Sequence, residues 1–195
     1  MKKISLACAI SIAVFIVSCM NTDKGKEAGS STKEPLSQEQ LVNRGKYLVR
    51  IGGCGDCHSP KAMGANGPME DTTLLLSGFQ RTDSFAVPAA QAIRQGVIFN
   101  HQSTAYAGPW GISYAANLTP DATGIGSWTF EQFDKAMREG KAKGLENSRP
   151  LLPPMPWPNY RNMEADDMKA IFAYLRSIKP VKNVTPAPQP PTVFH

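Results

Sequence analysis

The sequence has few cysteines, no hydrophobic run long enough to span a bilayer and no concentration of charge of one sign. Four cysteines among 195 residues are too few for a scaffold built on several disulfides. The apolar run from Ile4 to Val17 is about 14 residues long, whereas a membrane helix needs about 20. The 21 basic and 16 acidic residues are interspersed and give a net charge of only +5, which argues against a dedicated nucleic-acid binder.

The composition is that of a folded domain with a large share of loops. Hydrophobic residues make up 42% and charged residues 19% of the chain, so a buried core is feasible. A length of 195 residues suggests one domain with tails rather than two full-sized domains. Sixteen prolines and sixteen glycines indicate that much of this domain is loop and turn.

The first residues have the pattern of an export signal. Lys2 and Lys3 precede the apolar run, which ends in Ile16-Val17-Ser18-Cys19 and resembles the bacterial lipobox. We therefore expect residues 1–18 to be a lipoprotein signal peptide and Cys19 to carry the lipid. The alternative is an ordinary secretory signal with an incidental cysteine. Either reading predicts an extracytoplasmic protein, and the lipobox predicts a membrane-anchored lipoprotein facing the periplasm.

The remaining chain divides into three parts by composition. Residues 19–35 contain few apolar side chains and are expected to form a lipidated flexible tether that reaches about 20 Å. Residues 36–179 are the expected folded domain. Residues 180–195 carry five of the prolines and are expected to be extended, either loose or laid along the domain.

Three helices are predicted within the folded part. Ser37 to Gln40 is a capping box that opens a helix to about Ile51, where Gly52-Gly53 ends it. A second capping box, Thr129 to Gln132, opens a helix that ends at Gly140. The third helix runs from about Glu164 to Ile178, and its apolar stripe comprises Met168, Ile171, Phe172, Leu175 and Ile178. Residues 90–95 are expected to form a further short helix, and the stretches 59–87 and 96–126 to be loops.

The candidate chemistry lies in Cys54-Gly55-Asp56-Cys57-His58. A Cys-x-x-Cys-His run is typical of covalent c-type haem attachment: Cys54 and Cys57 are spaced to bond one porphyrin, and His58 becomes an axial ligand of the iron. A redox dithiol is the first competing interpretation, but it normally follows a strand, whereas this pair follows a predicted helix and a double glycine. A structural zinc site and a plain disulfide also compete with haem attachment.

Met155 is the first candidate for the second axial ligand. It lies in Leu151-Leu152-Pro153-Pro154-Met155-Pro156-Trp157-Pro158, where flanking prolines restrict the backbone. His101 and His195 are alternatives, His101 in a polar stretch and His195 in the tail. Further methionines fall just after the attachment motif or in and beside predicted helices, where methionine is ordinarily core: Met63, Met69, Met137, Met163 and Met168.

From about Gln40 to Val181 the chain resembles class I-type cytochromes c, specifically the cytochrome modules associated with membrane-bound alcohol, gluconate and sorbitol dehydrogenases. The resemblance begins with Arg44-Gly45-Lys46-Tyr47-Leu48 and the Cys-x-x-Cys-His run. It continues through Tyr114 to Asp121 and Thr123 to Trp128, and ends with Leu152 to Trp157 and the last amphipathic helix.

This resemblance implies further roles for particular residues. His58 and Met155 would be the axial ligands of one covalently bound haem c. Gly45 and Tyr47 would pack on the last helix near Tyr174. The carbonyl of Pro68 would accept the ring N–H of the ligand histidine and fix its orientation. Such modules often carry two or three haem motifs per chain, whereas this sequence has one.

We therefore expect an all-α, cytochrome c-like fold in which the first and last helices cross and long loops wrap the haem. The expected function is the relay of single electrons between a membrane-associated dehydrogenase and an oxidase or another cytochrome, without enzymatic activity of its own. Redox proteins and, through the lipid, the membrane would be the partners, and no nucleic acid would be bound. The alternatives are a thiol-disulfide oxidoreductase using Cys54 and Cys57 and a haem-based sensor with a displaceable ligand.

Overall fold

The computed structural model describes residues 35–194, and the unit that begins at Leu36 contains all the helices and strands discussed below. The expected signal peptide, the expected lipidation site Cys19 and the candidate ligand His195 lie outside the described residues.

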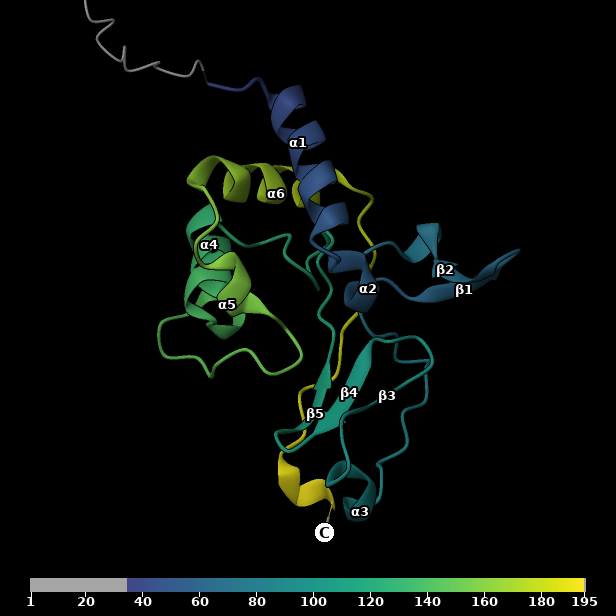
Figure 1. Ribbon diagram of the computed structural model, residues 1–195. Helices are drawn as coiled ribbons and strands as arrows, with labels where there is room; N and C mark the ends of the chain where they lie inside the picture. Colours follow the sequence, from purple (N-terminus) through teal and green to yellow (C-terminus); the bar gives the residue numbers. More distant parts are fainter. Residues whose placement is uncertain (1–34, 195) are drawn as a thin grey trace, which may run out of the picture. The chain divides into compact units, whose positions relative to one another are not determined.

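Two crossing helices form the upper part of this unit (Figure 1). The first, α1 (Gln38–Ile51), begins with the predicted capping box: the Ser37 hydroxyl accepts the Gln40 N–H, and the Gln40 side chain accepts the Ser37 N–H. The other, α6 (Ala165–Ser177), buries the predicted stripe of Met168, Ile171 and Leu175. Both predicted helices are confirmed.

Gly45 sets how closely α1 and α6 approach each other. A Cβ atom at this position would collide with the backbone carbonyl of Ala170 and with the Cβ of Tyr174. Next to this glycine, Arg44 forms a bidentate ion pair with Asp167 of α6, at 2.8 and 2.9 Å. The predicted contact of Gly45 with the last helix is confirmed. Tyr47 is 55% exposed, and the Arg44 guanidinium lies over its ring.

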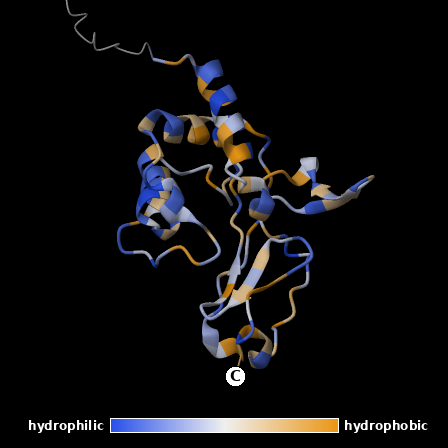
Figure 2. Cartoon of the chain, in the orientation of Figure 1, coloured by the Kyte–Doolittle hydropathy of each residue, from blue (hydrophilic) through white to orange (hydrophobic). Residues whose placement is uncertain are grey.

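The remaining α-helices are one longer helix and three short ones. The helix α4 (Phe130–Glu139) has the predicted capping box of Thr129 with Gln132, and it ends at Gly140 with a φ of 66°, both as expected. Three helices are short: α2 (Cys54–His58), α3 (Ala90–Ile93) and α5 (Trp157–Tyr160). Figure 2 shows hydrophilic and hydrophobic residues interspersed along α1 and α4, as expected for helices with one buried face.

Five short strands contradict the all-α expectation. The strands β1 (Lys61–Gly64) and β2 (Gly67–Glu70) form an antiparallel hairpin in the first stretch predicted to be loop. The strands β3 (Ile98–Phe99), β4 (Ala105–Gly108) and β5 (Gly111–Tyr114) form a three-stranded antiparallel sheet in the second. With only two to four residues each, rich in glycine and alanine, these strands have no apolar alternation that reveals them in the sequence.

The C-terminal segment lies along the folded unit. Gln189 forms a backbone bridge with Ile112, next to the β5 edge of the sheet. Asn183 is buried, and its side-chain amide donates to the carbonyls of Ser77 and Phe79 at 2.7 and 2.9 Å. Residues 180–194 therefore contribute to the fold. They connect the sheet to the loop that follows the 3-10 helix η1 (Thr72–Leu74).

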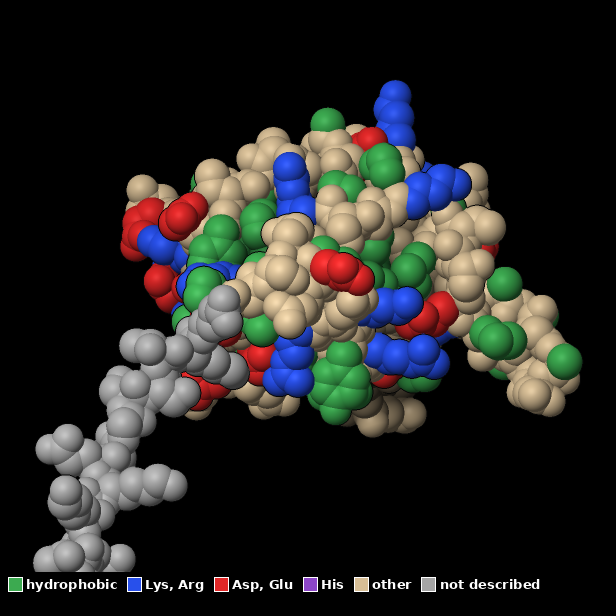
Figure 3. Space-filling view, turned by 90° about the horizontal axis from the view of Figure 1, so that it is seen from above, with side chains coloured by type: hydrophobic (Ala, Val, Ile, Leu, Met, Phe, Trp, Pro, Cys, Tyr) green, Lys and Arg blue, Asp and Glu red, His purple; other side chains and the backbone are tan. Residues whose placement is uncertain are grey.

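Among residues 35–194, none of the helices combines the length and the hydropathy needed to cross a bilayer. The face in Figure 3 carries basic and acidic side chains in mixture, with apolar side chains between them, and no single-sign stripe.

Candidate functional site

A cavity of about 420 Å³ lies among α1, α2, α4, α6 and the loop that carries Met155. Its lining is mainly aliphatic and aromatic, with buried side chains from three helices and the loop between β5 and α4; these include Leu48, Ile125, Phe133, Ile171 and Leu175. Cys54, Cys57 and His58 line one part of it. The structure thus brings the sequence-predicted motif onto the wall of a largely apolar cavity.

The two thiols are placed by the short helix α2. Gly53, at a φ of 65°, turns the chain sharply between α1 and α2, so that Cys54 begins a new helix. Both cysteines are free, with no disulfide between them. Burial raises the pKa of the Cys54 thiol to about 11. A redox dithiol requires a thiol whose pKa is lowered, so this environment does not favour that alternative.

His58 is held by a contact that the sequence did not predict. Its ring Nδ1 lies 2.8 Å from the carbonyl oxygen of Ala116. Because a carbonyl only accepts, Nδ1 carries the proton, and Nε2 keeps the free lone pair that a metal ligand needs. Burial lowers the pKa of His58, which keeps the ring neutral, while the hydrogen bond to Ala116 acts in the opposite direction.

The predicted role of Pro68 is therefore wrong in this structure. Pro68 lies in β2, opposite Met63 in the exposed hairpin, and the carbonyl that orients His58 belongs to Ala116. The two partners of this hydrogen bond are 58 residues apart in the sequence. Ala116 belongs to a stretch that carries the resemblance, but its carbonyl has no local sequence signal.

Lys61 is a second residue that sequence reasoning missed. Its ammonium donates to the carbonyls of Gly55, Asp56 and Ser59, at and just beyond the C-terminal end of α2. The Gly55 carbonyl also accepts the Ser59 N–H at 3.1 Å, and the positive charge of Lys61 interacts favourably with the negative C-terminal end of the helix dipole. Lys61 therefore stabilises the short helix that carries Cys54, Cys57 and His58.

Two tyrosines form hydrogen bonds at and just before the same helix. The hydroxyl of Tyr160 donates to the carbonyl of Gly52 at 2.8 Å, just before α2. The hydroxyl of Tyr106, in β4, lies 3.0 Å from the sulfur of Cys57 and 2.6 Å from the carbonyl of Ser103. Both tyrosines line the cavity. Burial, as the first cause, raises the pKa of each phenol, so both stay protonated.

Met155 also lines this cavity. It closes a turn whose Pro153–Pro154 bond is cis, with the Met155 N–H donating to the carbonyl of Leu152 at 3.2 Å. Met137 and Met163 line the same cavity, although the sequence indicated an ordinary core role for both. Met63 and Met69 lie on the exposed hairpin, at 80% and 59% exposure.

His101, the alternative ligand, lies elsewhere. It is exposed, its ring contacts the Gln102 side chain, and it is not among the described residues that line the cavity. Nor do any three His, Cys, Asp or Glu side chains among residues 35–194 gather as a structural metal site would require. The described geometry therefore favours neither His101 as a ligand nor the zinc alternative.

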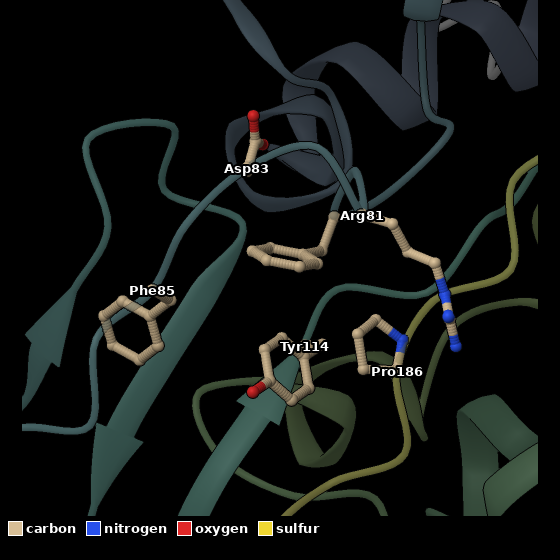
Figure 4. Close-up of a pocket in the computed structure, with 6 residues that line it drawn as sticks. Arg81, Asp83, Phe85, Tyr114 and Pro186 are labelled. Carbon is tan, nitrogen blue, oxygen red and sulfur yellow. The ribbon is translucent and has the colours of Figure 1, made fainter.

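A second hollow, of about 350 Å³, has no chemistry of this kind. Tyr114 lines both hollows, and the second is otherwise bordered by Phe79, Arg81, Asp83, Phe85 and Pro186. Figure 4 shows the Tyr114 ring next to Pro186, with the Arg81 guanidinium directed away from the aromatic rings. Arg81 donates to the carbonyl of Val184 and so ties the C-terminal segment to this edge.

The residues of the first cavity fit a covalently bound porphyrin. Two free thiols spaced by two residues lie on an apolar wall, next to an imidazole whose Nε2 is free. An apolar disc requires such walls, and its metal requires such a nitrogen. Fold and site together define a protein that holds a c-type haem.

Comparison with known proteins agrees with this class. The family model described as "Cytochrome c" matches residues 42–179, well over half of the chain. The chain therefore belongs to the cytochrome c family, whose members bind haem c covalently and carry electrons.

Several curated relatives are named as subunits of dehydrogenases. The gluconate 2-dehydrogenase cytochrome c subunit of Pantoea cypripedii is 33% identical over 74% of this chain and 25% of its own length. The cytochrome c subunit of the quinone alcohol dehydrogenase of Gluconacetobacter polyoxogenes is 30% identical over 75% of this chain and 24% of its own length. A nicotinate dehydrogenase subunit of Pseudomonas putida is 45% identical over 42% of this chain and 7% of its own length. The chain spans a quarter or less of each of these three relatives.

Proposed function

We propose that this protein is an extracytoplasmic electron carrier whose single haem c is ligated by His58 and Met155. Bound in the cavity, the haem supplies a centre that gains and loses one electron. The chain's own residues bind it through Cys54 and Cys57, orient His58 through Ala116 and exclude water with the apolar lining. The observation that carries the proposal is that Cys54, Cys57, His58 and Met155 all line one apolar cavity.

Met155 is preferred over the two other methionines of the cavity for a structural reason. Met137 lies within α4 and is 9% exposed, where methionine ordinarily fills the core. Met163 follows α5 and is flanked by Asn162 and Glu164, so no neighbouring proline restricts its backbone. Met155 lies in a turn between prolines, which already restrict its backbone. Little further conformational entropy is therefore lost when its thioether, a weak ligand, binds the iron.

We further propose that the donor is a membrane-associated dehydrogenase and the acceptor an oxidase or another cytochrome. The names of the three relatives support this, because each is a subunit of a dehydrogenase. The lipobox-like Ile16-Val17-Ser18-Cys19 supports a lipid anchor facing the periplasm. An anchored carrier with a tether would remain close to membrane-bound partners.

Replacing the three cavity methionines one at a time tests the ligand assignment. In the ferric wild type we expect a low-spin spectrum with the weak red band of a sulfur–iron(III) bond. Met155→Leu should abolish this band and lower the reduction potential, because a thioether ligand raises it. The volume-conserving controls Met137→Leu and Met163→Leu should keep both. Loss of the band in either control, or its survival in Met155→Leu, would refute the assignment, as would a high-spin His101→Ala protein.

A further inference from the structure

The turn that carries Met155 has few hydrogen-bond donors of its own. Prolines occupy positions 150, 153, 154, 156 and 158, and proline has no backbone N–H. The segment can therefore be tied to the rest of the protein mainly through its carbonyl groups, which need donors from other elements. Its start is held by the Leu151 N–H, which donates to the Gly140 carbonyl at 2.6 Å.

Ser113 supplies the donor for the turn itself. Its hydroxyl lies 2.6 Å from the carbonyl oxygen of Pro153, two residues before Met155. The indole Nε1 of Trp110 lies 3.3 Å from the same hydroxyl. An indole N–H only donates and a carbonyl only accepts, so the direction of both bonds is fixed: Trp110 to Ser113 to Pro153.

This chain of hydrogen bonds comes from the sheet that the sequence did not reveal. Ser113 lies in β5, where it pairs with Tyr106 of β4, and it is only 8% exposed. Trp110 lies in the connection between these two strands, and its ring packs over Gly108. Ser113 is also part of the cavity lining. The edge strand β5 thus contacts the Met155 turn through a residue that lines the cavity.

We propose that Ser113 is a positioning residue that holds the Met155 turn against the haem cavity. The inference rests on the proposed function, in which Met155 is an axial ligand. Without the Ser113 hydroxyl, the Pro153 carbonyl and the Trp110 N–H both lose their partner. The turn then moves away from the cavity more readily, and the weak bond from Met155 yields more easily to an external ligand.

The test is a titration of the ferric, full-length holoprotein with imidazole, which competes for the position of Met155. Ser113→Ala should bind imidazole about fivefold more tightly than wild type, the factor that corresponds to one lost hydrogen bond. Ser113→Thr keeps the hydroxyl and should restore the wild-type affinity. Ser177→Ala is the matched control, because this exposed hydroxyl donates to the Tyr174 carbonyl at 2.8 Å, in α6.

The outcomes separate this inference from the ligand assignment. If Met155→Leu loses the sulfur–iron band while Ser113→Ala binds imidazole as wild type does, the assignment stands and the role of Ser113 is refuted. If Met155→Leu keeps the band, both are refuted. Should Ser113→Ala not fold, Ser113→Cys replaces it: its thiol donates weakly, so its imidazole affinity should exceed that of wild type. Wild-type affinity in Ser113→Cys would also refute the role of Ser113.

Discussion

Adding a single methyl group at Gly45 should separate the two helices that cross above the haem cavity. The new Cβ of Gly45→Ala would meet the backbone carbonyl of Ala170 and the Cβ of Tyr174, neither of which can rotate away. The helix α1 also contributes Leu48 to the cavity, and α6 contributes Ile171 and Leu175. A shift at the crossing therefore changes both the core and the haem site.

Two opposing contributions decide the magnitude. In a helix interior, Gly to Ala is favourable by about 1 kcal/mol. Overpacking a tight contact costs about 3 kcal/mol when the neighbouring atoms are backbone, the upper end of the usual range. We therefore expect a net loss of about 2 kcal/mol, or a decrease in melting temperature of about 4 to 8 °C for a protein of this size.

Thermal unfolding of the holoprotein, followed by circular dichroism, measures this effect. Gly96→Ala is the matched control, because a Cβ at that position would meet no atom within 4 Å. The control should melt within about 1 °C of wild type, since surface substitutions away from special features have small effects. A Gly45→Ala protein that melts together with the control would show that the helix crossing does not depend on a glycine.

Two further predictions concern covalent attachment. Changing Cys54 and Cys57 together to alanine should leave a chain from which acid-acetone removes all haem, because no thioether bond can form, whereas wild type should retain it; haem that survives extraction in the double variant would contradict the attachment site. Cys19→Ala should move the protein out of the membrane fraction or block its processing, as judged by fractionation and by mass. Unchanged membrane association without any loss of lipid mass would show that Cys19 carries no lipid.

Much of the local structure could be predicted from the sequence, because neighbouring residues decide it. The capping boxes at Ser37 and Thr129 depend on a side chain three positions along, and the left-handed end at Gly140 depends on one glycine. The stripe of α6 needs only helical spacing. The haem motif is also local, because its two thiols and its imidazole must reach one group from a single short helix. Its residues therefore stand together in the sequence.

The strands could not be predicted because they depend on distant segments rather than on their own residues. Two to four residues form no recognisable alternation, and β3, β4 and β5 are strands only because they pair with one another. The all-α expectation was wrong for this reason. The placement of the C-terminal segment also depends on a distant pairing, because Gln189 pairs with Ile112, 77 positions earlier in the sequence.

The sequence by itself predicted the haem-attachment motif and determined where the three long helices begin and end. Only the tertiary structure decided what holds the site in shape: Ala116 rather than Pro68 orients His58, and Ser113 reaches Pro153 across 40 positions. Helix caps and a contiguous motif satisfy donors and acceptors within a few residues. A carbonyl in a proline-rich turn, or an imidazole at the end of a short helix, must find its partner wherever folding brings one, and no local pattern encodes that partner.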